Sequence, residues 1–122
     1  MIKFLDLPKI NARFETQFKH QFDSFLSTGQ YILGDGVNTF ETNYAAFCGT
    51  KHCIGVSNGF DALVLIFKGY MELGILNKGD QVIVPANTFI ASILALLEVG
   101  LEPILVEPNP ITFNIESKDI QK

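Results

Sequence analysis

A short polar turn, Asn58-Gly59-Phe60-Asp61, interrupts the otherwise apolar stretch CIGVSNGFDALVLIF (residues 53–67). Gly59 permits a tight turn and a close approach of the main chain to a ligand. If a helix begins here, its free N–H groups and its dipole favour an anion such as a phosphate. In the alternative, Asn58 caps the helix and Asp61 bonds back to it, so that the protein supplies its own negative charge. The glycine spacing matches neither GxGxxG nor a Walker motif, and the stretch alone leaves both interpretations open.

A second polar turn occurs in PANTFIAS (residues 85–92). Pro85 is expected to end a strand, and Asn87 or Thr88 to cap the following helix. Phe89 then lies in the first helical turn, where an aromatic ring could stack on a flat ligand. The alternative is that Phe89 belongs to the core. No pattern typical of a Ser/His/Asp triad, a Cys/His pair or a metal cluster is present, so we expect no metal site.

Both turns fall at element junctions in the second half of the chain. Residues 53–57, 81–86 and 102–107 are apolar runs typical of strands, and residues 60–74 and 88–99 show helical spacing. The order β-α-β-α-β predicts an α/β domain with a mostly parallel sheet. Ligands of such sheets bind at the carboxyl ends of the strands, which is where both turns lie.

The first half of the chain reads as helical. Residues 11–28 are predicted to form a helix with Asn11 as N-cap and Gly29 as its end, and residues 37–47 a second helix that stops at Gly49. Large apolar residues recur at helical spacing in the first helix, and we expect this stripe to be a packing face: Phe14, Phe18, Phe22, Phe25 and Leu26.

The composition restricts the function classes. The chain has 122 residues, is 48% hydrophobic and carries a net charge of −4, which suits a globular domain or part of one and predicts no nucleic-acid partner. No apolar run is long enough to span a bilayer, and the N-terminal residues lack a signal-peptide pattern, so we expect a cytoplasmic protein with no membrane partner. Cys48 and Cys53 are expected to be a reduced, buried pair.

Several stretches together resemble the DegT/DnrJ/EryC1/StrS family of pyridoxal-phosphate (PLP)-dependent nucleotide-sugar aminotransferases. They follow one another as GQYILGDGVNTFETNYAAFCGTKHCIGVSNGFDAL, GDQVIVPANTFIAS, GLEPILVE and TFNIE. The resemblance runs from about residue 5 to residue 120. NGFDAL is most similar to members that make 3-amino-3,6-dideoxyhexoses on a dTDP carrier.

The resemblance implies the N-terminal part of a fold type I transferase, a three-layer αβα architecture with a mostly parallel sheet. Residues 1–122 would be an N-terminal segment of the PLP-dependent large domain and an incomplete domain. Within it, residues 1–50 would form a helical N-terminal arm and residues 51–122 the βαβαβ portion. The resemblance further implies a homodimer or a complementing chain as partner, a nucleotide-linked keto-deoxy sugar as substrate, and glutamate as amino donor.

The site residues are carried over by position. Asn58, Gly59 and Phe60 would hold the cofactor phosphate, mainly through main-chain N–H groups, and Phe89 would stack on the pyridine ring. Asn87 and Thr88 would line the same pocket, and Tyr31 would reach the substrate. These assignments come from the resemblance and not from the spacing of the residues.

The chain departs from the family pattern in one respect. No lysine occurs in the context of the Schiff-base lysine, so we assign no catalytic residue and expect no transamination by this chain alone. By the family's strand order, residues 53–57 would not neighbour residues 81–86, and strand edges and helix faces would be exposed. The alternatives are a non-catalytic α/β module or fragment that associates with a partner chain, and a small nucleotide-binding domain.

Overall fold

The structure, a computed structural model, describes residues 3–120. The chain divides into two compact units, Met1–Gly55 (the first unit) and Val56–Lys122 (the second unit). Each unit has its own local organisation, and each is described by itself. No helix among the described residues is long and apolar enough to cross a membrane.

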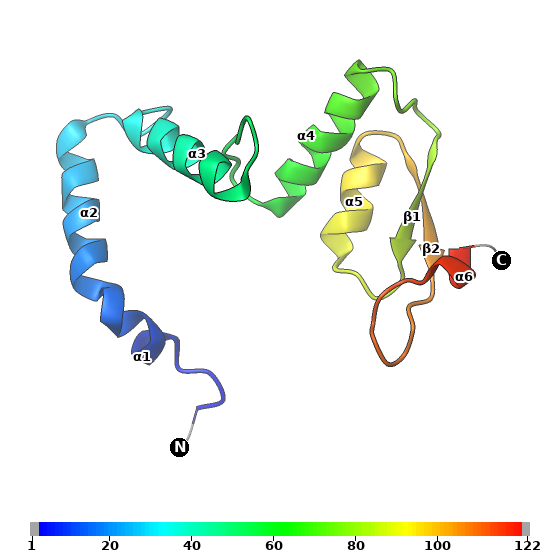
Figure 1. Cartoon of the computed structure of the whole chain (residues 1–122), viewed down its shortest axis with the longest axis horizontal. Helices are drawn as coiled ribbons and strands as arrows, with labels where there is room; N and C mark the ends of the chain where they lie inside the picture. Colours follow the sequence, from blue (N-terminus) through cyan, green and yellow to red (C-terminus); the bar gives the residue numbers. More distant parts are fainter. Residues whose placement is uncertain (1–2, 121–122) are drawn as a thin grey trace. The chain divides into compact units, whose positions relative to one another are not determined.

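The regular elements in the described part of the first unit are all helices (Figure 1). In chain order they are α1 (Leu7–Asn11), the 3₁₀ helix η1 (Ala12–Phe14), α2 (Glu15–Thr28) and α3 (Asp35–Cys48). Gly29 and Gly49 end α2 and α3 with left-handed φ angles of 67° and 68°. A side chain would be strained in that conformation, so the two glycines act as the predicted C-caps.

The predicted start of the first helix is wrong. Asn11 is the last residue of α1 and makes no side-chain capping bond to the η1 turn. Asp6 caps the helical segment instead, because its Oδ1 accepts the Lys9 N–H at 3.3 Å. Pro8, at the start of α1, has no N–H to satisfy, which suits a first helical turn.

The aromatic stripe of α2 is exposed. Phe18 and Phe22 retain 60% and 59% of their accessible surface, and Phe25 retains 42%. On α3, Phe40 and Tyr44 stack on each other with ring centroids 5.5 Å apart, yet both remain largely exposed. In the first unit, Ala45 is the one residue that is buried among those described. The expected packing face is therefore present but uncovered.

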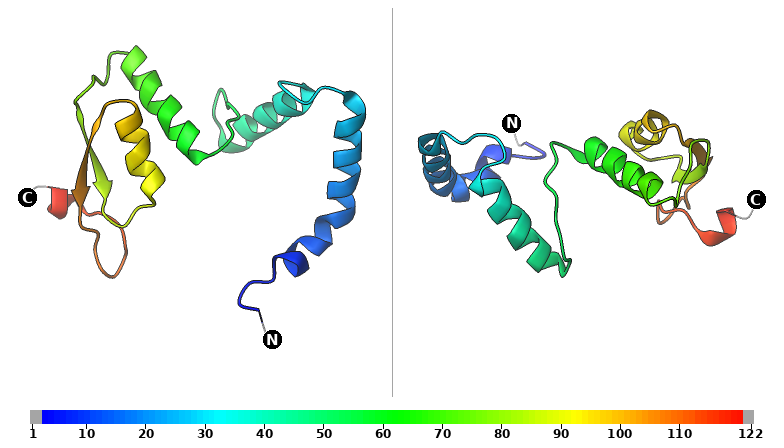
Figure 2. Two further views of the ribbon diagram at one scale, coloured as in Figure 1. Left: turned by 180° about the vertical axis from the view of Figure 1, so that it is seen from behind. Right: turned by 90° about the horizontal axis from the view of Figure 1, so that it is seen from above.

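The second unit is an α/β layer structure. It contains α4 (Gly59–Glu72), β1 (Gln81–Pro85), α5 (Ile90–Glu98), β2 (Glu102–Val106) and α6 (Ser117–Ile120). Strands β1 and β2 pair in parallel, from Gln81 opposite Glu102 to Pro85 opposite Val106. Helix α5 crosses between them and lies beside the sheet, as Figure 2 shows from behind, and α4 packs on α5. The predicted α/β class with a parallel sheet is confirmed.

One small hydrophobic core holds the second unit together. Leu96 on α5 and Leu101 before β2 are 1% and 2% exposed, and Val64 from α4 and Val84 from β1 complete the contact between helices and sheet. The apolar area buried at these positions stabilises the fold by about 25 cal/mol per Å². The turns at the strand ends join elements that pack in this core.

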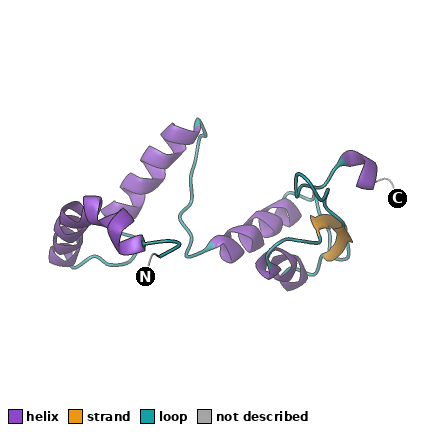
Figure 3. Cartoon of the chain, turned by 90° about the horizontal axis from the view of Figure 1, so that it is seen from below, coloured by secondary structure: helices purple, strands orange, loops and turns teal. Residues whose placement is uncertain are grey.

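The predicted strand at residues 53–57 is wrong. The segment has no strand structure and is drawn as loop between α3 and α4 in Figure 3. A strand requires a neighbouring backbone, and no described segment pairs with this one. A side chain takes that place in part, because the Glu41 carboxylate accepts the Gly55 N–H at 2.6 Å. The βαβαβ order is thus reduced to one βαβ unit preceded by α4.

The two cysteines are free, as expected, but the predicted burial is not found. Cys48 is exposed and Cys53 is half-buried. The cause is the same as for the missing strand, because nothing in the described chain covers this side of α3 and of the segment that follows it.

Candidate functional site

The N-terminus of α4 is built by its capping residue. Asn58 has extended backbone angles (φ −162°, ψ 173°), and its Oδ1 accepts the Asp61 N–H at 3.0 Å. Its main-chain carbonyl accepts the Ala62 N–H at 3.1 Å and so begins the helical ladder. Asn58 is therefore the N-cap, which was one of the two interpretations that the sequence left open.

Asp61 does not complete the expected capping box. Its Oδ2 accepts hydrogen bonds from the Ser57 hydroxyl and, at 3.0 Å, from the Asn58 side-chain amide. The carboxylate thus bonds to side chains and not to the main chain at the helix start. Within the described chain, the N–H groups of Gly59 and Phe60 have no acceptor.

This turn fits a phosphate group on two counts. Two main-chain donors are free at the positive end of a 14-residue helix, and a Cβ added to Gly59 would meet no atom within 4 Å. A hollow of about 350 Å³ lies beside the turn, lined by Val56, Ser57, Asp61, Val64 and Leu65. The Asp61 carboxylate opposes a second anion, and its bonds to Ser57 and Asn58 reduce that opposition.

The turn after β1 presents an aromatic ring. Phe89 is 78% exposed, so the alternative that it belongs to the core is wrong. The predicted caps Asn87 and Thr88 are also wrong: α5 begins at Ile90, and its N-cap is Phe89, with no side-chain capping bond. Thr88 Oγ1 lies 3.0 Å from Ser92 Oγ instead. An exposed ring at a strand end is free to stack on a flat ligand.

Four element ends lie at the same end of the second unit. In Figure 1, β1 and β2 point toward the end at which α4 and α5 begin. The structure thereby brings six of the seven predicted site residues to the same end of one unit: Asn58, Gly59, Phe60, Asn87, Thr88 and Phe89.

The seventh predicted site residue, Tyr31, lies in the first unit. Its hydroxyl donates to the Leu26 carbonyl at 3.0 Å, and its ring lies 5.2 Å from that of Phe25, centroid to centroid. These contacts fix Tyr31 against the C-terminal turn of α2, and the ring remains 57% exposed.

A structured loop that was not predicted from the sequence follows β2 at residues 109–116 (the Asn109 loop). Asn109 Oδ1 accepts the N–H groups of Ile111 and Thr112 at 2.8 and 3.2 Å, and its Nδ2 donates to Glu116 at 2.5 Å. A hydrogen bond from Lys118 is the main cause that lowers the pKa of the Glu116 carboxyl. The sequence signal was an asparagine between two prolines, a pattern typical of side-chain-to-main-chain turns.

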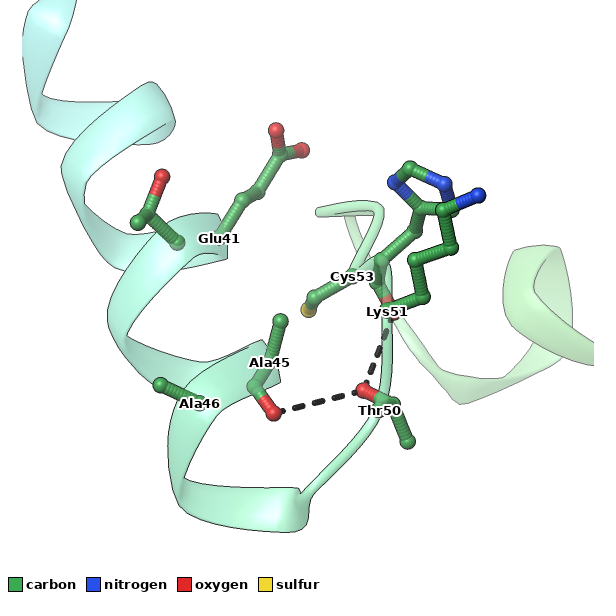
Figure 4. A pocket seen from close by; sticks show the side chains of 8 residues that line it. Glu41, Ala45, Ala46, Thr50, Lys51 and Cys53 are labelled. Atoms are coloured by element: carbon green, nitrogen blue, oxygen red, sulfur yellow. Dashed lines mark hydrogen bonds between the residues drawn. The ribbon is translucent and has the colours of Figure 1, made fainter.

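An open hollow in the first unit is not part of this site. It measures about 400 Å³ and lies between α3 and the segment after it, where Thr50 bonds the Ala45 and His52 carbonyls (Figure 4). Its lining includes Glu41 and Cys53 but no predicted site residue. Among the described residues, no group of three or more His, Cys, Asp or Glu side chains could hold a metal ion.

Known proteins match this chain over nearly all of it. A dTDP-3-amino-3,6-dideoxy-alpha-D-galactopyranose transaminase of Aneurinibacillus thermoaerophilus is 48% identical over 122 residues, which are 100% of this chain and 32% of that protein. The solved structure of S. venezuelae DesV superposes with a TM-score of 0.87 at 36% identity, over 98% of this chain and 31% of that one. NtdA from Bacillus subtilis, solved with bound cofactor PMP, gives 0.82 at 34% identity, over 98% and 27%.

The chain thus spans about a third of the length of the relatives it matches. Its structural neighbours are aminotransferases of fold type I, which confirms the predicted fold class. The DegT/DnrJ/EryC1/StrS aminotransferase family matches residues 13–122, and the chain belongs to that family.

Proposed function

We propose that this chain is the N-terminal part of a PLP-dependent aminotransferase that acts on a nucleotide-linked keto-deoxy sugar. The observation that carries the proposal is the turn at the start of α4, where Gly59 and Phe60 offer two free N–H groups and Gly59 has no Cβ. Family membership supports a cofactor phosphate as the ligand of that turn, because relatives are transaminases of nucleotide sugars by name and a structural neighbour was solved with bound PMP.

Each site residue has a separate task in this proposal. Gly59 and Phe60 hold the cofactor phosphate through their N–H groups, and Asn58 keeps the helix start in place by its cap. Phe89 covers one face of the pyridine ring and excludes water from it, and Thr88 and Asn87 line the pocket beside it. PLP, when bound, supplies the electron sink that amino-group transfer requires.

For the substrate, we propose a dTDP-linked 3-keto-6-deoxyhexose, with glutamate as amino donor. The support is the 48% identity to a transaminase whose named product is a dTDP-3-amino-3,6-dideoxy sugar. Tyr31, with its ring exposed beside the end of α2, is proposed to reach this substrate.

We further propose that the chain does not transaminate by itself. A transaminase needs a lysine amine that holds the cofactor and moves its proton, and no lysine here resembles the family's lysine in context. Residues 1–50 would serve as the arm and residues 51–122 as the cofactor-binding portion of a larger domain.

The phosphate site can be tested with a matched pair of glycine substitutions on α4. Gly59→Ala and Gly69→Ala both add a methyl group into open space, so neither is expected to disturb the fold. Equilibrium dialysis should show PLP binding by the original chain and by Gly69→Ala, and weaker binding by Gly59→Ala, because the new methyl group occupies the position of the phosphate. Pyridoxal, which lacks the phosphate, should bind the three proteins equally weakly.

Two results would contradict the proposal. Equal binding of PLP by both variants would show that the phosphate lies elsewhere. Borohydride reduction that fixes PLP on one single lysine of this chain would show that the catalytic amine is present after all.

A second candidate role is association with another chain, either a second copy or a complementing chain. It is favoured by the exposed aromatic faces of α2 and α3, where Phe18, Phe22 and Phe47 retain 59–86% of their surface. A stable, monodisperse monomer in solution would contradict this role.

A further inference from the structure

The Asn109 loop is a closed and well-bonded turn. Besides the three bonds of the Asn109 side chain, its N–H donates to the Asn114 carbonyl at 2.9 Å, and its carbonyl accepts the Phe113 N–H at 2.8 Å. Phe113 has a φ angle of 58°, in the left-handed region that a phenylalanine rarely adopts. Such a conformation persists only where the surroundings fix it, and it often marks a functional part of a protein.

The Phe113 carbonyl has a partner outside the loop. Asn87 Nδ2 donates to it at 3.3 Å, across 26 positions of the sequence. Asn87 belongs to the turn after β1, in which the Ala86 N–H bonds the Val106 carbonyl at 2.9 Å and the Thr88 N–H bonds the Pro85 carbonyl at 3.1 Å. The Asn87 amide therefore ties the loop after β2 to the turn that leads into Phe89. Figure 1 shows the loop, in orange, at the tips of both strands.

The contacts of Phe89 show why the hydrogen bond from Asn87 to the Phe113 carbonyl affects the Phe89 ring. Phe89 precedes α5 without a side-chain cap and is 78% exposed, so no core contact holds its ring. What fixes its backbone is the turn from Pro85 to Thr88 on one side and α5 on the other. Release of that turn from the loop would leave the ring direction less well defined.

We infer that Asn87 is a positioning residue, which fixes the direction of the Phe89 ring by holding the Asn109 loop through the Phe113 carbonyl. The inference deepens the proposed function and rests on it in one respect, namely that the Phe89 ring contacts a ligand. In it, the Asn87 amide nitrogen serves the protein and not the substrate, and Phe89 makes the contact with the ligand.

The test measures loop and ring separately, in the full chain and without cofactor. Asn87→Asp keeps the shape of the side chain but removes the N–H donor, and Asn87→Gln keeps the donor. Asn109→Ala opens the loop while Asn87 remains. Asn77→Asp is the control for the added charge, since it lies in the turn before β1 at the other end of the strand.

In Asn87→Asp, amide exchange at Ile111 and Thr112 is expected to rise about threefold to tenfold, the effect of one lost hydrogen bond. The NMR signal of the Phe89 ring, assigned by its loss in Phe89→Leu, should shift in Asn87→Asp and in Asn109→Ala. It should stay in place in Asn77→Asp and recover at least in part in Asn87→Gln.

Three results would overturn the inference. In the first, amide exchange in the loop rises while the Phe89 signal stays in place. In the second, Asn87→Asp changes neither the exchange of the loop nor the Phe89 signal. In the third, protection of β1 and β2 is lost together with that of the loop in both Asn87→Asp and Asn109→Ala. The last result would make Asn87 a residue for general stability. Addition of PLP to the original chain separates the positioning role from the proposed cofactor site. If PLP does not shift the Phe89 signal but substitution of Asn87 does, the proposed cofactor site is wrong and the positioning role stands.

Discussion

The two units of this chain contain helices of the same length but differ in what those helices bury. Helices α2, α3 and α4 have 14 residues each. In the second unit, α5 packs on the sheet and α4 packs on α5, and the two helices bury Val64, Ala95 and Leu96. In the first unit, Ala45 is the one buried residue among those described. Helix formation and burial are thus separate properties of this sequence. Caps and apolar periodicity specify helix formation, whereas burial needs a surface on which the helix can pack.

The largest effect expected from this difference is on the free energy of unfolding. Leu96→Ala removes a side chain that is 1% exposed and should destabilise the second unit by about 2–5 kcal/mol. Phe22→Ala removes a larger side chain that is 59% exposed and should change stability by at most about 0.5 kcal/mol. Denaturant unfolding followed by amide exchange in β1 and β2 for Leu96→Ala, and in α2 for Phe22→Ala, measures the two changes. A comparable loss in both variants would contradict the contrast between the units.

The next effect concerns the uncovered stripe of the first unit. If it is covered by a second chain, the double substitution of Phe18 and Phe22 by serine should weaken association at least about tenfold, because one buried phenylalanine contributes about 1.5–3 kcal/mol. Gln17→Ser is a matched control on the same helix. Sedimentation velocity over a range of concentrations gives the association constants, and equal values for all three proteins would exclude the stripe as the interface.

The features that sequence predicted well are those that depend on neighbouring residues. Gly29 and Gly49 end helices because of their own backbone freedom, and Asn58 caps α4 through an amide only three residues away. The parallel pairing of β1 with β2 was also predictable, since the helix between them is short and apolar.

The features that sequence did not predict depend on distant or absent contacts. The segment 53–57 has strand composition but no pairing backbone among the described residues, so it is a loop, and its Gly55 N–H bonds to Glu41. The role of Asn87 could not be seen either. As a candidate cap it satisfied a local rule, yet in the structure it bonds a carbonyl 26 residues away, in a turn whose geometry is set by Asn109.

The smallest effects concern one ion pair in each unit. Hydrogen bonds from lysine lower the pKa of both carboxyls: Lys19 acts on Glu15 within α2, and Lys118 acts on Glu116 at the end of the Asn109 loop. A carboxyl whose pKa is lower in the folded than in the unfolded chain stabilises the fold above its unfolded pKa. That contribution is lost as the pH falls through the folded pKa.

Acid should therefore act differently on the two pairs. In α2, protonation of Glu15 removes one contact of the first turn, and the helical ladder keeps the rest of the helix. In the second unit, Glu116 also accepts the Asn109 amide at 2.5 Å, so its protonation should increase exchange at Ile111 and Thr112 as well. NMR titration from about pH 6 to about pH 2 measures both responses.

Glu116→Gln is the control for the loop. It keeps an oxygen acceptor for Asn109 but has no charge, and should abolish the pH response of the loop while that of α2 persists. If the loop of Glu116→Gln still opened in acid, another titrating group would cause the response. The two units would then differ in what they bury, but neither ion pair would affect structure beyond its own contact.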